Sequence, residues 1–92
     1  MTTKQQGRAL VVDDYPAARE SMAAMLLAMG CEVAEQSPGG QDALERLTKG
    51  ANEGRPYDLL LLDWLMPGMS GAELIEELRA NDVALPAMTL VV

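Results

Sequence analysis

The chain contains no histidine among its 92 residues. Without an imidazole it cannot form a Ser-His-Asp triad, a Cys-His pair or a histidine-based metal site. Any chemistry must therefore use carboxylates, hydroxyls, backbone groups or a bound metal. The absence excludes most of the common hydrolase and zinc-enzyme arrangements.

Cysteine and long apolar runs are also scarce. Cys31 is the single cysteine, so no internal disulfide can form, and a small, partly buried apolar residue is the simplest interpretation of it. No apolar run approaches the roughly 20 residues of a membrane helix, and the start, MTTKQQGR, lacks the apolar core of a signal peptide. We therefore expect a cytoplasmic domain without membrane contact.

Basic residues are outnumbered by acidic ones, 7 to 14, and the formal net charge is -7. No basic patch stands out, which argues against nucleic-acid binding by this chain. An acidic surface could attract cations or basic partners, although simple solvation of the charges is the commoner explanation. The length allows one small domain, and the 49% hydrophobic content excludes a disordered chain.

Short apolar runs alternate with helical patterns along the chain. The predicted strands cover residues 8–12, 31–36 and 57–62, with a fourth within 85–92, and the predicted helices lie within 15–30, 37–50 and 70–81. Strands that alternate with short helices predict a parallel sheet with right-handed crossovers and helices on both faces. The 57–62 run, YDLLLL, is continuously apolar, so we expect both of its faces to be covered.

Residues typical of helix ends support these helices. Pro16 suits a first turn and Gly30 the position after the last, while Ser37 and Pro38 suggest the start of the second helix. The third has a capping box of Ser70 with Glu73. The positions expected to face the core are Ala18, Met22, Met25, Leu26 and Met29 in the first helix, Ala43, Leu44 and Leu47 in the second, and Leu74, Ile75 and Leu78 in the third.

Three carboxylates follow two of the strands. Asp13 and Asp14 end the first strand and Asp63 ends the third. If these strands are neighbours, the three side chains share a pocket at the carboxyl edge of the sheet, where such folds bind ligands. Packed carboxylates remain ionised when a cation joins them, and an all-oxygen set favours Mg²⁺. A carboxylate beside Mg²⁺ can also attack phosphorus, although a single aspartate at a strand end is more often a cap or turn former.

Several motifs carry a family resemblance: LVVDD at 10–14, Arg19, LLLLDW at 59–64 and MPGMSG at 66–71. With these residues at these spacings, the chain resembles the receiver domain of two-component response regulators, especially receivers attached to hybrid sensor histidine kinases. The resemblance covers residues 8–92, with residues 1–7 as an N-terminal tail. It implies an α/β, flavodoxin-like, doubly wound parallel sheet of order 2-1-3-4-5, of which this chain holds the first four strands.

The resemblance also implies roles. Asp63 matches the phosphoacceptor, which takes a phosphoryl group from a partner's phosphohistidine in a phosphorelay. Asp13 and Asp14 match the acidic Mg²⁺ site, and the backbone carbonyl of Leu65 matches a further Mg²⁺ ligand. The implied partner is a histidine kinase or a histidine phosphotransfer domain. The implied activity is that of a signalling domain that assists its own phosphorylation, rather than that of a turnover enzyme.

The chain departs from the family pattern near its C-terminus. Counted from Pro86, the family's hydroxyl at the end of strand four falls at Val91, Val92 or beyond, and Thr89, the nearest hydroxyl, comes too early in the strand. The family's lysine at the end of strand five has no counterpart, since the only lysines are Lys4 and Lys49. We therefore expect the domain to be incomplete at its C-terminus, or completed by a dimer or by a strand from a swapped partner.

Two alternatives remain open. A receiver-shaped interaction module that no longer switches would also explain the missing hydroxyl and lysine. A free-standing Mg²⁺-dependent phosphatase is the other alternative. The usual aspartate-based phosphatases place a second acid two residues after the nucleophile, where this chain has Leu65.

Overall fold

The computed structural model describes residues 7–92, which form four strands and three helices in the predicted order. Their bounds are β1 Arg8–Val12, α1 Pro16–Ala28, β2 Val33–Ser37, α2 Gly40–Asn52, β3 Leu59–Leu62, α3 Gly71–Ala80 and β4 Met88–Val91. All neighbouring strands are parallel, and their order in the sheet is β2-β1-β3-β4. The predicted flavodoxin-like topology is confirmed.

Strand β1 lies between β2 and β3, and its register aligns the ends of all three. Val12 is opposite Ser37 on one side and Leu62 on the other. The ladder continues one residue further, because Asp13 N–H donates to the Ser37 carbonyl at 3.1 Å and Asp63 N–H donates to the Val12 carbonyl at 2.9 Å. Asp13 and Asp63 therefore lie at the same level, at the carboxyl edge of the sheet, and Asp14 follows Asp13 directly.

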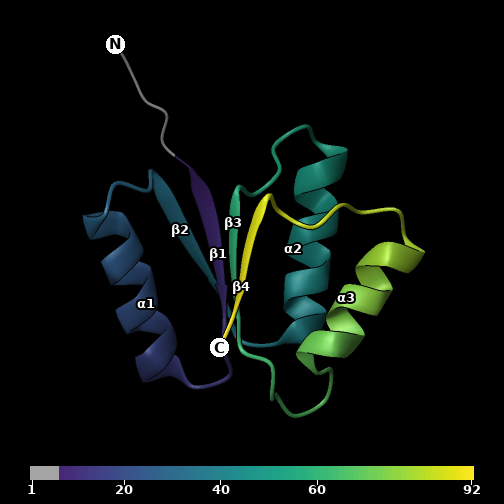
Figure 1. Ribbon diagram of the computed structural model, residues 1–92, viewed down its shortest axis with the longest axis horizontal. Helices are drawn as coiled ribbons and strands as arrows, with labels where there is room; N and C mark the ends of the chain where they lie inside the picture. The colour runs from purple at the N-terminus through teal and green to yellow at the C-terminus, as the bar shows by residue number, and fades with distance from the viewer. Residues whose placement is uncertain (1–6) are drawn as a thin grey trace.

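The helices form a layer on each side of the sheet (Figure 1). Helix α1 packs on β2 and β1 from one side, whereas α2 and α3 pack together on the other. The main apolar core fills the second layer, where Leu10, Val12, Leu60 and Leu62 meet buried side chains of α2 and α3. The expected inward positions of those helices are confirmed, with Ala43, Leu47, Leu74 and Leu78 buried and Leu44 and Ile75 packed against them.

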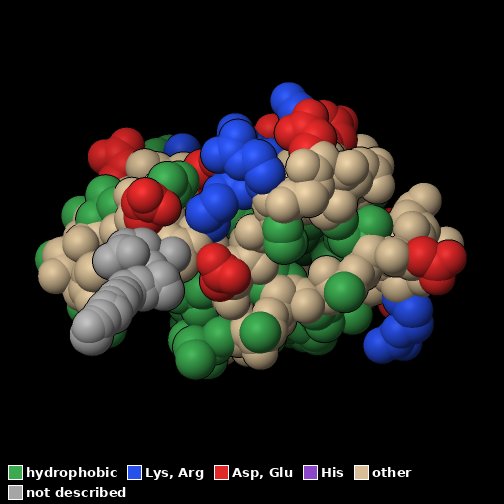
Figure 2. Space-filling model, turned by 90° about the horizontal axis from the view of Figure 1, so that it is seen from above, with side chains coloured by type: hydrophobic (Ala, Val, Ile, Leu, Met, Phe, Trp, Pro, Cys, Tyr) green, Lys and Arg blue, Asp and Glu red, His purple; other side chains and the backbone are tan. Residues whose placement is uncertain are grey.

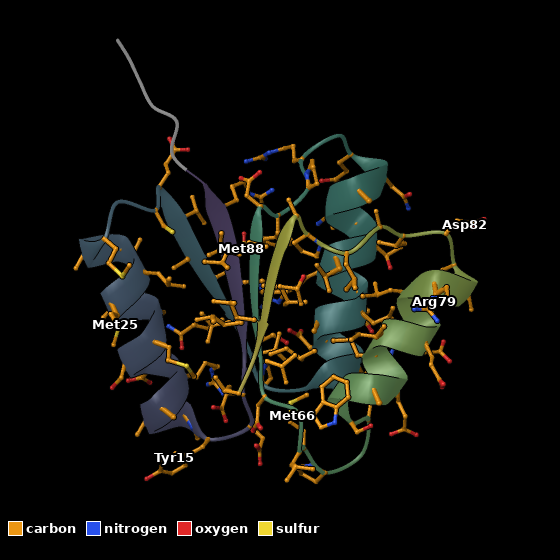
Figure 3. The ribbon with its side chains drawn as sticks, in the orientation of Figure 1. Tyr15, Met25, Met66, Arg79, Asp82 and Met88 are labelled. Carbon is orange, nitrogen blue, oxygen red and sulfur yellow. The ribbon has the colours of Figure 1, made fainter. Side chains whose placement is uncertain are left out.

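The methionine stripe predicted to face the core in α1 is wrong at two positions. Met25, labelled in Figure 3, is 60% exposed and Met29 is 75% exposed, whereas the buried residue of the helix is Ala23. Met22 and Leu26 are half-buried. On its side of the sheet, helix α1 packs on β2 and β1 only. The side of the helix that faces away from these strands packs on no other element of residues 7–92.

The predicted start of the second helix is also wrong. Ser37 is the last residue of β2, and its hydroxyl donates to the Gly39 carbonyl at 3.0 Å instead of capping a helix. Pro38 precedes the N-cap residue Gly39, and α2 begins at Gly40. The predicted capping box of α3 is confirmed, since Ser70 and Glu73 exchange both hydrogen bonds. The Pro16 start of α1 is confirmed as well.

Strand β4 is one of the two edge strands of the described sheet, opposite β2, and it is apolar. Met88, Leu90 and Val91 are each about half exposed or more. On the α1 side of the sheet, Leu59 and Leu61 of β3 are half-buried, so the prediction that both faces of this strand are covered holds only on the α2–α3 side. The structure contains one chain, and the pairing of β4 with a partner's strand stays a prediction. None of the helices in residues 7–92 is long and apolar enough to span a membrane.

A network of charged and aromatic side chains lies at the end of the sheet where the strands begin. Arg8 on β1 stacks on the Tyr57 ring, 4.6 Å from its centroid, and its guanidinium donates to Glu35 on β2 at 3.2 Å. Glu35 also accepts from the Tyr57 hydroxyl at 2.5 Å and from Arg46 on α2 at 3.0 Å. Figure 2 looks onto this edge, where Lys and Arg side chains gather beside acidic ones. Four segments of the chain thus meet around one carboxylate.

The network shifts the ionisation of its members. Partial burial acts to raise the pKa of Glu35, but hydrogen bonds from Tyr57, Arg8 and Arg46 outweigh it and hold the pKa below its ordinary value of 4.5. Burial, with the bond to Glu35, raises the pKa of Tyr57 to about 12. A carboxylate whose pKa is lowered by folding stabilises the folded chain above its unfolded pKa.

We predict that Glu35→Gln lowers the free energy of unfolding by about 1 kcal/mol at pH 7, because hydrogen bonds to partly exposed charges contribute on this order. The deficit relative to wild type should shrink as the pH falls below 4.5, where the unfolded carboxylate takes up a proton, and vanish below the lowered pKa of the native Glu35. Urea titrations of both proteins at several pH values measure this difference in the free energy of unfolding. Glu32→Gln, an exposed carboxylate just before β2, is the control. A deficit that does not change with pH would contradict the prediction.

Candidate functional site: an acidic cluster at the strand ends

Three carboxylates meet where the strands end. Asp13 and Asp14 follow β1, Asp63 follows β3, and one carboxylate oxygen from each lies within 4.8 Å of the other two. The pairing of β1 with β3 brings the residues together, although they are far apart in the sequence. This is the arrangement expected from the sequence. An oxygen-only set of this size fits a small hard cation such as Mg²⁺, which needs few protein ligands.

The three carboxylates differ in their surroundings. Asp13 is 7% exposed and accepts the Tyr15 backbone N–H at 2.9 Å, Asp14 is exposed, and Asp63 is half-buried. Partial burial raises the pKa of Asp63, and the charges of Asp13 and Asp14 raise it further, whereas the Leu65 N–H bond to its Oδ1 at 3.2 Å acts against them. The cluster is electrostatically unfavourable until a positive charge enters it.

Arg19 braces the first acidic pair from α1. Its Nη1 donates to the Asp13 carbonyl oxygen at 2.9 Å, and its Nε donates to the Gln36 side chain on β2 at 3.2 Å. The guanidinium therefore ties the turn after β1 to the neighbouring strand. Tyr15, labelled in Figure 3, lies at the end of the molecule that carries the acidic cluster. It is 64% exposed.

The loop after Asp63 turns the chain into α3. Its Gly68 has φ +79, a backbone conformation that glycine adopts without strain. The Leu65 side chain is 83% exposed beside the cluster, while Met66 is buried in the core. The backbone N–H of Gly71 donates to the Trp64 carbonyl at 3.1 Å, so the loop is closed at its base.

The positions where the chain departs from the family pattern lie at the end of β4 and in α2. Leu62 pairs with Val91, so Val92 lies level with Asp63, and no hydroxyl occupies that place. Thr89 lies earlier, opposite Leu60, and its hydroxyl donates to the Pro86 carbonyl at 3.0 Å. Lys49 is in the last turn of α2, at the edge where the strands begin, and Lys4 lies outside the described residues.

Two glycines, Gly71 and Gly40, also lie against the loop after Asp63. A Cβ atom at Gly71 would lie 2.7 Å from the Trp64 ring, and one at Gly40 would lie 2.8 Å from the Cβ of Met69. Each glycine is the first residue of a helix that abuts the loop after Asp63. Their only sequence signal is a small residue in a first helical turn, which many helices share.

A parallel α/β sheet with acids at the ends of its two central strands defines a class of domain that binds its ligand at the carboxyl edge. The family model described as the response regulator receiver domain matches residues 9–92. The chain therefore belongs to the response regulator receiver family of two-component signalling.

Individual relatives are similar over limited parts of their length. The chain is 33% identical over 73 residues to the chemotaxis protein CheY-3 of Vibrio cholerae serotype O1, covering 79% of this chain and 52% of the relative. It is 32% identical over 91 residues to the hybrid signal transduction histidine kinase L of Dictyostelium discoideum, covering 97% of this chain and 5% of that protein. The chain thus spans about half the length of the first of these relatives.

A solved structure is similar in fold. The crystal structure of the receiver domain of the histidine kinase CKI1 from Arabidopsis thaliana, complexed with Mg²⁺, superposes with a TM-score of 0.78 at 29% identity. The match covers 92% of this chain and 66% of that one. The relation to receivers of hybrid kinases, first indicated by the motifs, is confirmed.

We predict that Arg19→Gln lowers the free energy of unfolding by about 1 kcal/mol, because two hydrogen bonds from a charged donor are lost. The Asp13 to Tyr15 turn should also lose amide protection against hydrogen exchange, since the brace is gone. Arg79→Gln, an exposed arginine in the last turn of α3 and distant from Tyr15 in Figure 3, is the matched control. Equal effects of the two substitutions would contradict the bracing role.

Proposed function

We propose that the chain is the phosphoacceptor receiver of a phosphorelay, in which Asp63 takes a phosphoryl group from a phosphohistidine on a partner protein. The observation that carries the proposal is the convergence of Asp13, Asp14 and Asp63 within 4.8 Å at the carboxyl edge of the sheet. Family membership supports it. The absence of histidine from this chain means that the donor is another protein or another domain.

The proposed step is a direct displacement at phosphorus. An oxygen of the Asp63 carboxylate forms the new P–O bond while the P–N bond of the donor breaks, and the electron pair of that bond stays on the imidazole nitrogen, which takes up a proton. Asp63 suits this role because its backbone N–H is held by a 2.9 Å hydrogen bond to the Val12 carbonyl of β1. Its side chain is half-buried, yet open to a partner. The product is an aspartyl phosphate and a free histidine.

The ligands for Mg²⁺ in this proposal are the carboxylates of Asp13, Asp14 and Asp63 and the backbone carbonyl of Leu65. When bound, the ion neutralises charge that gathers on the phosphoryl oxygens during transfer. Asp13 is already oriented by the Tyr15 N–H and the Arg19 brace, so little ordering is needed on binding. The Mg²⁺ complex of the CKI1 receiver supports this assignment.

The proposed partner is a histidine kinase or a histidine phosphotransfer domain, and the proposed location is the cytoplasm. The similarity to a hybrid histidine kinase and to a histidine kinase receiver supports that class of partner. The exposed side chains of Tyr15 and Leu65 beside the cluster offer apolar contact area for it. In this role the chain undergoes phosphorylation rather than turning over a substrate.

A second candidate, a receiver-shaped module that does not switch, is favoured by one observation. Val91 and Val92 stand at and just after the end of β4, where the family places a hydroxyl, and Lys49 sits at the opposite edge of the sheet. Such a module would bind Mg²⁺ and partners but would not hold a phosphoryl group. An experiment on the acceptor residue distinguishes the two.

We predict that incubation with Mg²⁺ and a small phosphodonor adds one phosphoryl group to the protein, observed by mass spectrometry of the intact chain. Asp63→Asn should abolish the adduct, because an amide is not a nucleophile toward phosphorus. Asp58→Asn, a change just before β3 rather than just after it, should keep the adduct.

The other outcomes decide between the alternatives. Mg²⁺ binding without any adduct supports the non-switching module. Release of phosphate without a lasting adduct supports a phosphatase. An adduct that persists in Asp63→Asn contradicts the choice of acceptor.

We predict that Asp14→Asn raises the dissociation constant for Mg²⁺ roughly tenfold or more, since a carboxylate ligand is lost. Asp14 is exposed, and its charge repels those of Asp13 and Asp63, so the substitution should not destabilise the apo-protein and should slightly stabilise it. Fluorescence of Trp64, the residue after Asp63 and the only tryptophan, follows the titration. Asp82→Asn is the control, because it makes the same charge change at a residue that lies beyond α3 in Figure 3. The affinity of this variant for Mg²⁺ should equal that of wild type. Equal losses in both variants would point to a general charge effect.

A further inference from the structure

The loop between β3 and α3 carries the acceptor Asp63 at its first position and ends at the N-cap residue Ser70. Three contacts hold it from within the loop and from α3: the Leu65 N–H bond to Asp63, the Gly71 N–H bond to Trp64, and the capping box of Ser70. A loop this short and this constrained transmits a displacement at one residue to its neighbours.

A fourth contact comes from α2. Gly40 is buried at the first position of that helix, and its backbone lies directly against Met69 of the loop. A Cβ atom built at Gly40 would lie 2.8 Å from the Cβ of Met69 and 2.9 Å from its carbonyl oxygen, closer than real Cβ atoms come. Met69 cannot simply move aside, because its side chain packs on the core and the next residue caps α3.

We propose that Gly40 is a positioning residue for the acceptor site: the missing side chain lets the loop seat on the N-terminus of α2, and this seating sets the place of Asp63 and of the Leu65 backbone. The inference rests on the proposed function for its consequence on phosphorylation, but the placement of the loop is independent of that function. A methyl group at Gly40 pushes Met69 outward by a few tenths of an ångström or more, and Asp63 and Leu65 move with it. Displacements of about 1 Å at a reacting group reduce rates by up to about a hundredfold.

A second glycine of the same helix provides a matched control. Gly50 is also buried in α2, and a Cβ atom there would lie 2.8 Å from the backbone carbonyl oxygen of Arg55. It therefore has the same kind of close backbone approach, but near the end of α2 at the edge where the strands begin (Figure 1). If Gly40 only stabilises the fold, Gly40→Ala and Gly50→Ala should behave alike at the acidic cluster.

The primary experiment needs no ligand. In amide NMR spectra of the full chain, Gly40→Ala should shift the signals of Asp63 and Leu65 clearly, whereas Gly50→Ala should shift those of Arg55 and Tyr57 and leave Asp63 in place. Mg²⁺ titrations and phosphorylation rates then measure the consequence. We expect Gly40→Ala to weaken Mg²⁺ binding and slow phosphorylation about tenfold or more, with Gly50→Ala within twofold of wild type. Both variants should lose similar stability in urea.

The results that overturn the inference are specific. Unchanged Asp63 and Leu65 signals in Gly40→Ala, or equal changes in the Gly50→Ala variant, would reduce Gly40 to a packing role. If wild type binds Mg²⁺ but takes no phosphoryl group, the proposed function fails, while the NMR and Mg²⁺ comparisons still decide the positioning role. Should Gly40→Ala not fold, Met69→Ala removes the loop's anchor from the core instead. Unchanged acceptor signals in that variant would equally refute the inference.

Discussion

The parallel pairing of β1 with β3 is the interaction on which the rest of the structure depends. It places Val12 opposite Leu62, so that the acids following each strand emerge side by side. The same pairing forms the floor of the core, because Leu10, Val12, Leu60 and Leu62 point together into the α2–α3 layer. Burial of these side chains holds three like charges near one another, at a cost that a bound cation can offset.

The sequence predicts much of this because the strongest signals are local or repeat along the chain. The LVVDD and LLLLDW motifs, with the alternation of strands and helices, indicate the topology and the acidic cluster. The Ser70 and Glu73 pair marks the start of α3. Where the prediction fails, tertiary context decides: Ser37 pairs in β2 instead of capping α2, and Met25 and Met29 stay exposed although they lie at helical spacing from the half-buried Met22 and Leu26. The contacts of Gly40 with Met69 could not be predicted, since they join segments with no shared pattern.

The acidic cluster and the end of β4 match the family pattern unequally. Asp13, Asp14 and Asp63 form a complete set of acids, and Arg19 braces the first of them. Opposite them, Val92 offers no hydroxyl, and Thr89 is tied to Pro86 too early in β4. The proposed phosphorylation of Asp63 thus uses acids that residues 7–92 contain, whereas the hydroxyl and the lysine of the family pattern have no counterpart beside them.

Helix α2 reaches both the end of the sheet where the strands begin and the end where they finish, so it links the two. Gly40 at its beginning rests on the loop after Asp63, while Arg46 further along bonds Glu35 in the charged network at the opposite edge. A helix of 13 residues is a rod about 20 Å long, and its hydrogen-bonded backbone resists bending. One rigid element therefore joins the charged network at one end of the sheet to the loop after Asp63 at the other.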